Sequence, residues 1–137
     1  MSDIGKFYRN EMYNPDSPLY IDFSFTMPDI QSVIDAIHNS GGLAFLAHLY
    51  VYNKRVYNDL SEIAQYDFDG FECKYPSFTQ AQSENLITFC KSNSLYCSGG
   101  SDFHGKRRPE ISMGTGDGNL TIEYTDVSAW INKLELI

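Results

Sequence analysis

Apolar residues recur through the middle of the chain in alternating helical and extended patterns. Residues 28–42 start with Pro28 and Asp29, which suit the first turn of a helix, and reach Gly41, a residue type that commonly ends one. Between them, apolar side chains repeat at the spacing of one helix face: Ile30, Val33, Ile34 and Ile37. The segment LAFLAH, residues 43–48, is short and apolar, which predicts a strand buried on both faces.

The alternation of helix and strand continues along the chain. A helix is predicted over residues 58–66, with Asn58 as its candidate cap, and an amphipathic helix over residues 79–93, where Thr79 and Gln82 have capping-box spacing. The segment DGFECKY alternates with the two-residue period of a strand, and LYCSGGSDFH reads as a third strand with its exit loop.

The three predicted strands begin near Leu43, Gly70 and Leu95, the spacing of successive β/α units. This regular alternation of helices and strands predicts an α/β fold with mostly parallel strands and crossover helices. A closed barrel needs roughly seven or eight such units, so we expect a partial β/α barrel. Residues 1–27 are predicted to be an irregular lead-in with a short helix near residues 4–12, and residues 28–137 to form the β/α domain.

Composition narrows the class of protein. The chain has 137 residues, 42% of them hydrophobic, which suffices for one packed domain. A formal charge of −8 gives no overall field for nucleic acid or an anionic membrane, although residues 106–108 form a local basic run. Neither a signal peptide nor a membrane span is apparent, and Cys73, Cys90 and Cys97 lie in apolar contexts typical of free thiols. We therefore expect a cytoplasmic protein without a membrane partner.

Polar residues that could carry chemistry follow the predicted strands. His48 ends LAFLAH, and Asp102 and His104 follow the third strand, among glycines that let the backbone approach a ligand closely. The carboxyl ends of parallel strands are where such folds hold their sites. If the backbone is extended there, Asp102 and His104 project to the same side and reach one cation or two adjacent ones. A hydrogen-bonded histidine and a turn-forming aspartate remain the alternatives.

Other polar residues are weaker candidates for a functional site. Glu72 and Lys74 share the second strand, either as a surface ion pair or as substrate contacts, and Tyr75 is placed to stack or hydrogen-bond at the mouth of a cleft. The basic run is either a solvated turn or an anion clamp. His38 lies near a helix C-terminus, where a structural role is expected.

Four segments resemble, in order and spacing, the second half of the PHP domain (polymerase and histidinol phosphatase). They are IDAIHNSGGLAFLAH, DGFECKYPSFT, CSGGSDFHG and GTGDGNL, and the resemblance covers roughly residues 3–125. More narrowly, the chain resembles stand-alone bacterial PHP metal-dependent phosphoesterases. The resemblance implies the C-terminal portion of a distorted (β/α)7, TIM-like barrel, with a multinuclear site of divalent zinc, manganese or iron ions as cofactor.

The resemblance also implies roles for single residues. His48 matches the histidine of an Ala-His-Pro motif, a metal ligand, although Leu49 stands where the family usually has proline. Asp102 and His104 match a late Asp-x-His, whose members bind different metals of the cluster. These three residues, His48, Asp102 and His104, are therefore the implied metal ligands and catalytic residues.

Around these ligands, the resemblance implies a substrate region. Glu72, Tyr75 and Ser77 match a segment near the family's site, and Arg107 or Arg108 is implied to touch phosphate. The family's N-terminal His-x-His strand and its further His, Asp and Glu ligands have no counterpart here.

The function implied is therefore that of the C-terminal portion of a phosphoesterase. It would hydrolyse a phosphorylated small molecule, a nucleotide or a nucleic-acid end. The chain alone is expected to bind metal weakly and to be inactive without the N-terminal half of the PHP domain. The alternative is a non-catalytic half-barrel that binds a partner or dimerises. A polymerase-associated PHP module is a third and weaker alternative.

Overall fold

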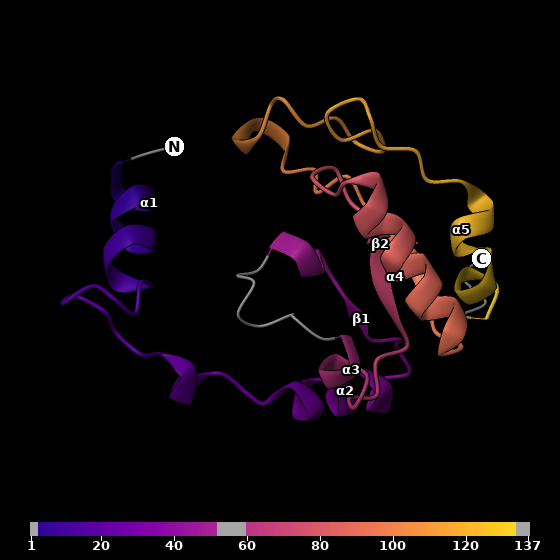
Figure 1. Cartoon of the computed structure of the whole chain (residues 1–137), viewed down its shortest axis with the longest axis horizontal. Coiled ribbons are helices and arrows are strands. Elements are labelled where there is room, and N and C mark those ends of the chain that lie inside the picture. Colours follow the sequence, from indigo (N-terminus) through magenta and orange to yellow (C-terminus); the bar gives the residue numbers. More distant parts are fainter. Residues whose placement is uncertain (1–2, 52–59, 134–137) are drawn as a thin grey trace.

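The computed structural model describes residues 3–51 and 60–133, and it contains three parallel strands and several helices. The strands are β1 (Phe45–Leu46), β2 (Gly70–Lys74) and β3 (Tyr96–Gly99), and they pair side by side in that order. Figure 1 shows the helices around this sheet. The α-helices are α1 (Asp3–Phe7), α2 (Ile30–Asn39), α3 (Leu60–Ile63), α4 (Gln80–Ser92) and α5 (Tyr124–Ile131).

Short helical turns complete the chain. A π-helical turn, η1 (Tyr8–Met12), continues α1, so the helix predicted near residues 4–12 is confirmed. Three 3-10 turns follow: η2 (Ser24–Thr26), η3 (Leu49–Val51) and η4 (Gly105–Arg107). The α/β class, the parallel strands and the order of elements agree with the prediction. The domain boundary after residue 27 stays a prediction, and Asn58 lies outside the described residues.

Local capping explains where the two long helices begin. The Asp29 carboxylate accepts a hydrogen bond from the Ser32 N–H at 2.9 Å and caps α2. Pro28 therefore precedes the cap and does not lie in the first turn as predicted. The capping box of Thr79 and Gln82 is confirmed at the start of α4. Gly41 follows α2 with a φ of 81°, a left-handed conformation that glycine adopts without strain.

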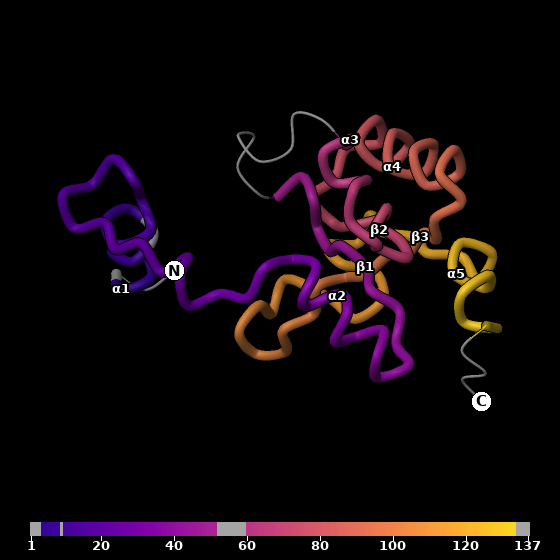
Figure 2. Tube along the Cα trace, turned by 90° about the horizontal axis from the view of Figure 1, so that it is seen from below, coloured from indigo at the N-terminus to yellow at the C-terminus, as the bar shows by residue number. Residues whose placement is uncertain are grey.

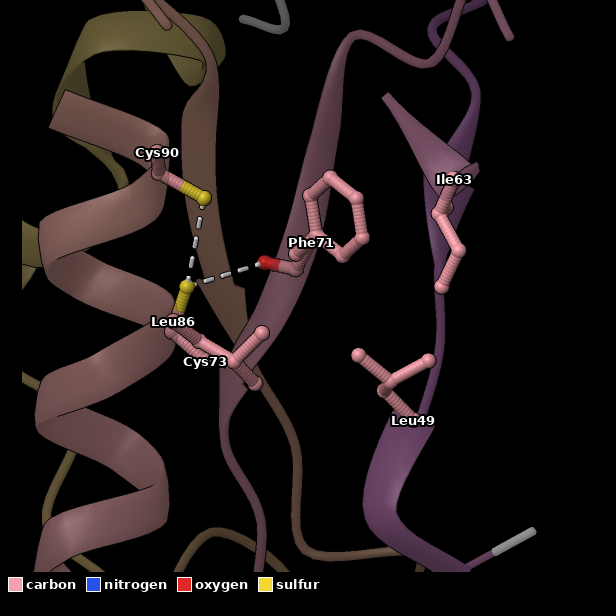
Figure 3. Close-up of a cluster of buried hydrophobic side chains, with 6 residues drawn as sticks. All are labelled: Leu49, Ile63, Phe71, Cys73, Leu86 and Cys90. Carbon is pink, nitrogen blue, oxygen red and sulfur yellow. Dashed lines mark hydrogen bonds between the residues drawn. The ribbon is translucent and has the colours of Figure 1, made fainter. Parts of the chain in front are cut away.

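The two faces of the sheet are covered by different helices, with α4 on one side and α2 on the other (Figure 2). On the α4 side, Phe71 and Cys73 of β2 pack with Leu86 and Cys90 of α4 in the main core (Figure 3). On the other side, Trp130 of α5 packs against Phe45 with the ring centres 5.2 Å apart and the rings tilted by 57°.

The first strand is shorter and less buried than LAFLAH predicted. Pairing extends only over Phe45 and Leu46, both half-buried, and β1 is an edge strand of the sheet. His48 has a φ of 35°, so the chain leaves the extended conformation there. The His48 N–H donates instead to the Glu72 carboxylate at 2.7 Å, which turns the backbone over the end of β2.

The N-terminal arm, residues 3–29, lies mostly away from the sheet (Figures 1 and 2). It exposes large apolar side chains, among them Phe25 at 83%, Met27 at 69% and Ile4 at 68%. No helix in the described part of the chain is both long enough and apolar enough to cross a membrane.

An ion pair ties α5 to the central strand. Lys74 Nζ lies 2.6 Å from Asp126 Oδ2, and the same carboxylate accepts from the Glu123 N–H at 2.8 Å. Burial opposes ionisation of Asp126, but the hydrogen bonds from Lys74 and Glu123 outweigh it and lower the pKa of Asp126.

Asp126→Asn is expected to lower the free energy of unfolding at neutral pH by about 1 kcal/mol, because it removes the ion pair and weakens the helix cap. A carboxylate whose pKa is lowered by folding stabilises the fold above its unfolded pKa, and this stabilisation is lost as the pH falls through its folded pKa. Urea unfolding at several pH values should therefore show the two proteins converging in acid. A difference that does not narrow as the pH falls below about 4, the ordinary pKa of an aspartate, would contradict this assignment.

Candidate metal-binding and phosphate-binding site

The carboxyl ends of the three strands meet at one edge of the sheet. His48 follows β1, Tyr75 follows β2, and residues 100–104 follow β3. Because the strands are parallel, the loops that carry these residues leave the sheet side by side. The sequence-predicted candidates, apart from the basic run, therefore lie along a single edge.

Tyr75 links the first and third loops of this edge. Its ring meets the His48 ring edge-on at 5.7 Å between centres, and its hydroxyl donates to Asp102 Oδ2 at 2.9 Å. Burial and the neighbouring Asp102 carboxylate raise the pKa of the Tyr75 hydroxyl, which keeps it protonated as a donor. Tyr75 thus holds the carboxylate in place and packs against the histidine.

Asp102 is the most heavily contacted side chain of the site. Besides Tyr75, the Arg108 guanidinium donates to Asp102 Oδ2 at 2.6 Å. The other carboxylate oxygen, Oδ1, lies 3.6 Å from His104 Nδ1. One oxygen is thus held by two donors, and the second faces an imidazole.

His104 turns its ring back on its own loop. Its Nδ1 lies 2.6 Å from the Asp102 carbonyl oxygen. A carbonyl oxygen only accepts, so Nδ1 must carry the proton, and a neutral ring then has its lone pair on Nε2. This is how metal-binding histidines are commonly oriented, with one nitrogen donating to an acceptor and the other left for the ion.

The Asp-x-His loop is not extended throughout. Asp102 has a φ of 53° and His104 a φ of −118°. The condition under which the two side chains would project to the same side of an extended backbone is therefore not met, and they approach each other in an irregular loop. Together with His48, Asp102 is one of three described non-glycine residues with positive φ, the third being Ser94. Such conformations cost about 1–3 kcal/mol and concentrate at functional sites.

Glu72 lies beneath the His48 loop and is half-buried. Burial raises the pKa of the Glu72 carboxyl, and the hydrogen bond from the His48 N–H acts in the opposite direction. A Cβ on Gly100 would lie 2.9 Å from Glu72 Oε1, so a larger residue after β3 would displace this carboxylate from its position under the His48 loop. The expected ion pair between Glu72 and Lys74 is absent, since Lys74 pairs with Asp126.

The glycine-rich motif GTGDGNL reaches back to the same edge. The Gly114 N–H donates to the buried Ser101 hydroxyl at 3.1 Å, and Gly116 lies so close to Pro76 that a Cβ would come within 2.8 Å of the ring. A cavity of about 310 Å³ opens nearby. It is lined by Lys74, Tyr75, Pro76, Phe78, Gln80, Ser83, Asn119, Leu120 and Thr121.

The three predicted ligands do not form a closed metal site by themselves. In the described part of the chain, the one group of three His, Cys, Asp or Glu side chains with ligand atoms within 4.8 Å of one another is Cys73, Cys90 and Cys97. The donors His48, Asp102 and His104 have the right chemistry for a divalent ion, imidazole nitrogen and carboxylate oxygen.

The residues of the basic run and His38 make different contacts. Arg108 contacts Asp102, whereas Lys106 and Arg107 are exposed on η4. His38 Nε2 lies 2.7 Å from Asp69 Oδ2, and this carboxylate also accepts from the Ala44 N–H, so His38 has the structural role expected of it. Sequence reasoning missed that Arg108 is bound to a predicted ligand and that the cysteines meet.

Comparison with known proteins adds the functional context. No family model and no curated protein matches the chain. Among solved structures, it is similar to a protein from Bifidobacterium adolescentis assigned as a metal-dependent phosphoesterase, with 27% identity and a TM-score of 0.68 over 97% of this chain and 45% of that one. The fold is also similar to that of an amidohydrolase from Chromobacterium violaceum with bound sulfate, at 20% identity and a TM-score of 0.64 over 98% and 45% of the two chains.

The chain thus spans less than half the length of both structural neighbours. It has the fold of part of a metal-dependent hydrolase, with a mixed α/β architecture and three parallel strands.

Proposed function

We propose that the chain contributes the C-terminal part of the active site of a PHP-type, metal-dependent phosphoesterase with a barrel-like fold. The observation that carries the proposal is the gathering of Tyr75, Asp102 and His104 with the His48 loop at the carboxyl edge of a parallel sheet. The likeness to a protein assigned as a metal-dependent phosphoesterase supports the reaction class.

In this proposal, His48, Asp102 and His104 hold divalent metal ions. When bound, such ions lower the pKa of a water molecule and polarise a phosphoryl oxygen. The His104 Nδ1–H bond to the Asp102 carbonyl directs Nε2 outward as a ligand atom. Tyr75 and Arg108 fix one oxygen of Asp102, which leaves Oδ1 for an ion.

Positive charge beside these residues suits a phosphorylated substrate. Arg108 is 42% exposed while it contacts Asp102 and Glu110, so part of its side chain remains accessible to an anion. Arg107 and Lys106 extend this charge along η4, in a chain whose net charge is −8. The substrate class is a phosphate ester, and Glu72 stays close as a half-buried carboxyl under the His48 loop.

A Mn²⁺ titration by calorimetry tests the metal site, because hard Mn²⁺ prefers imidazole and carboxylate over thiolate. We expect weak binding, with a Kd on the order of micromolar or above, since three protein ligands form an incomplete site. His48→Ala and Asp102→Asn should each weaken binding about tenfold or more. Hydrolysis of p-nitrophenyl phosphate by this chain alone should stay at background.

The matched control is Asp117→Asn, which removes an exposed carboxylate that accepts a local hydrogen bond from the Asn119 N–H at 3.3 Å. It should leave the Mn²⁺ affinity unchanged. If Asp117→Asn weakens binding as much as Asp102→Asn does, Mn²⁺ is held by diffuse acidic surface charge and the proposal fails.

A second candidate function is self-association through the N-terminal arm. Phe25 and Met27 expose 83% and 69% of their surface and lie two residues apart. Apolar surface that is exposed in this way is typical of a contact with another molecule. A partial barrel also leaves open sheet edges, which pair readily with another chain. In this alternative the arm packs against a second copy of the chain, and the molecule is a non-catalytic dimer.

Sedimentation velocity over a range of concentrations distinguishes this alternative. The wild-type chain should dimerise, and Phe25→Ser with Met27→Ser should shift it to monomer because apolar contact area is lost. Met113→Ser removes another methionine, 74% exposed in a loop, and should leave the dimer intact. A wild-type chain that is monomeric at every concentration would exclude self-association.

A further inference from the structure

Three cysteines from three elements converge in the core under α4. Cys73 lies on β2, Cys90 on α4 and Cys97 on β3, and their sulfur atoms all lie within 4.8 Å of one another. Figure 3 shows the thiols of Cys73 and Cys90 pointing toward each other between strand and helix, with the sulfurs 3.6 Å apart. None of the three forms a disulfide.

The distances suit a shared metal ion better than a covalent bond. Thiolates about 2.3 Å from a tetrahedral zinc ion stand roughly 3.8 Å apart, whereas the sulfurs of a disulfide are about 2.05 Å apart. The separation of 3.6 Å between Cys73 and Cys90 is close to the first value. A small closure by Cys97, the least buried of the three, would complete the trigonal set.

A cavity gives an ion access to this cluster. Its volume is about 210 Å³, and its lining includes Cys73 and Cys97 together with Lys91 and Asp126. This space exceeds what one water molecule needs, so a fourth, exchangeable ligand can be accommodated beside the thiols. Cys73 and Cys90 are fully buried in the core, so an ion would reach the cluster through the cavity beside Cys97.

One charged side chain beside the cluster would balance the charge of a metal–thiolate site. Lys91 lines the same cavity as Cys73 and Cys97. Three thiolates around a divalent ion carry a net charge of −1, which the Lys91 ammonium on the cavity wall offsets. Thiolates select soft or borderline ions such as zinc over magnesium or manganese.

We propose that Cys73, Cys90 and Cys97 form a zinc site on the α4 side of the sheet, with its fourth position open to the cavity. The site is separate from the carboxyl edge, because Cys73 and Cys90 lie in the core with Leu86 of α4, whereas Tyr75 and Asp102 contact each other in the loops that follow β2 and β3. Bound zinc would join α4 to β2 and β3, and its role is to stabilise the fold.

Zn²⁺ and Co²⁺ titrations of the full chain test this site. One equivalent of Zn²⁺ should bind with a Kd below about a micromolar, measured against a chromophoric chelator. Co²⁺ should give the charge-transfer absorption of thiolate ligands. Cys73→Ala and Cys97→Ala should each weaken Zn²⁺ binding at least about tenfold and remove that absorption. Ser98→Ala, which alters a neighbouring cavity residue, should do neither.

The outcome is independent of the proposed phosphoesterase site. The thiolate absorption should persist in His48→Ala, and its loss there would overturn the proposal. If the alanine variants fail to fold, the wild-type chain suffices: Zn²⁺ should slow alkylation of Cys97 about tenfold or more. Alkylation at an unchanged rate in saturating Zn²⁺, or absence of thiolate absorption with Co²⁺, would show that the cysteines are ordinary core residues.

Discussion

The parallel pairing of β1, β2 and β3 is the constraint on which the rest of the structure depends. Gly70 opens the central strand between Phe45 and Tyr96, and a Cβ there would lie 2.4 Å from the Tyr96 carbonyl oxygen. Close approach at this point sets the register of all three strands. Because the strands run in the same direction, their carboxyl ends bring His48, Tyr75 and the Asp-x-His loop to one edge.

At that edge, Asp102 connects the separate loops. It is bound by Tyr75 from the second loop and by Arg108 from η4, and it lies beside His104 of its own loop. A carboxylate held this firmly is oriented before any ion arrives, which reduces the entropy lost on binding. The left-handed backbone at Asp102 and His48 is a local conformational cost at this edge of the sheet.

Local features were predictable from the sequence, and long-range ones were not. The capping box of Thr79 and Gln82 joins residues three positions apart, so spacing alone identified it, whereas Asp29 was expected in the first turn of α2 and is its cap. The parallel direction of the strands followed from the spacing of the β/α units. The bend at His48 depends on a hydrogen bond to a residue 24 positions later, which no local pattern encodes. Likewise, the meeting of the cysteines depends on the register of β2 with β3 and on which helix face is buried.

The most direct test of the central claim is anomalous diffraction from crystals of the chain soaked in Mn²⁺. The account predicts a difference peak at the carboxyl edge of the sheet, within coordination distance of Asp102 Oδ1, with His104 Nε2 or His48 as a further ligand. Divalent ions bind oxygen and imidazole nitrogen at about 2.0–2.6 Å, so the ligands can be read from the map. Manganese found only on exposed carboxylates elsewhere, with this edge empty, would contradict the account.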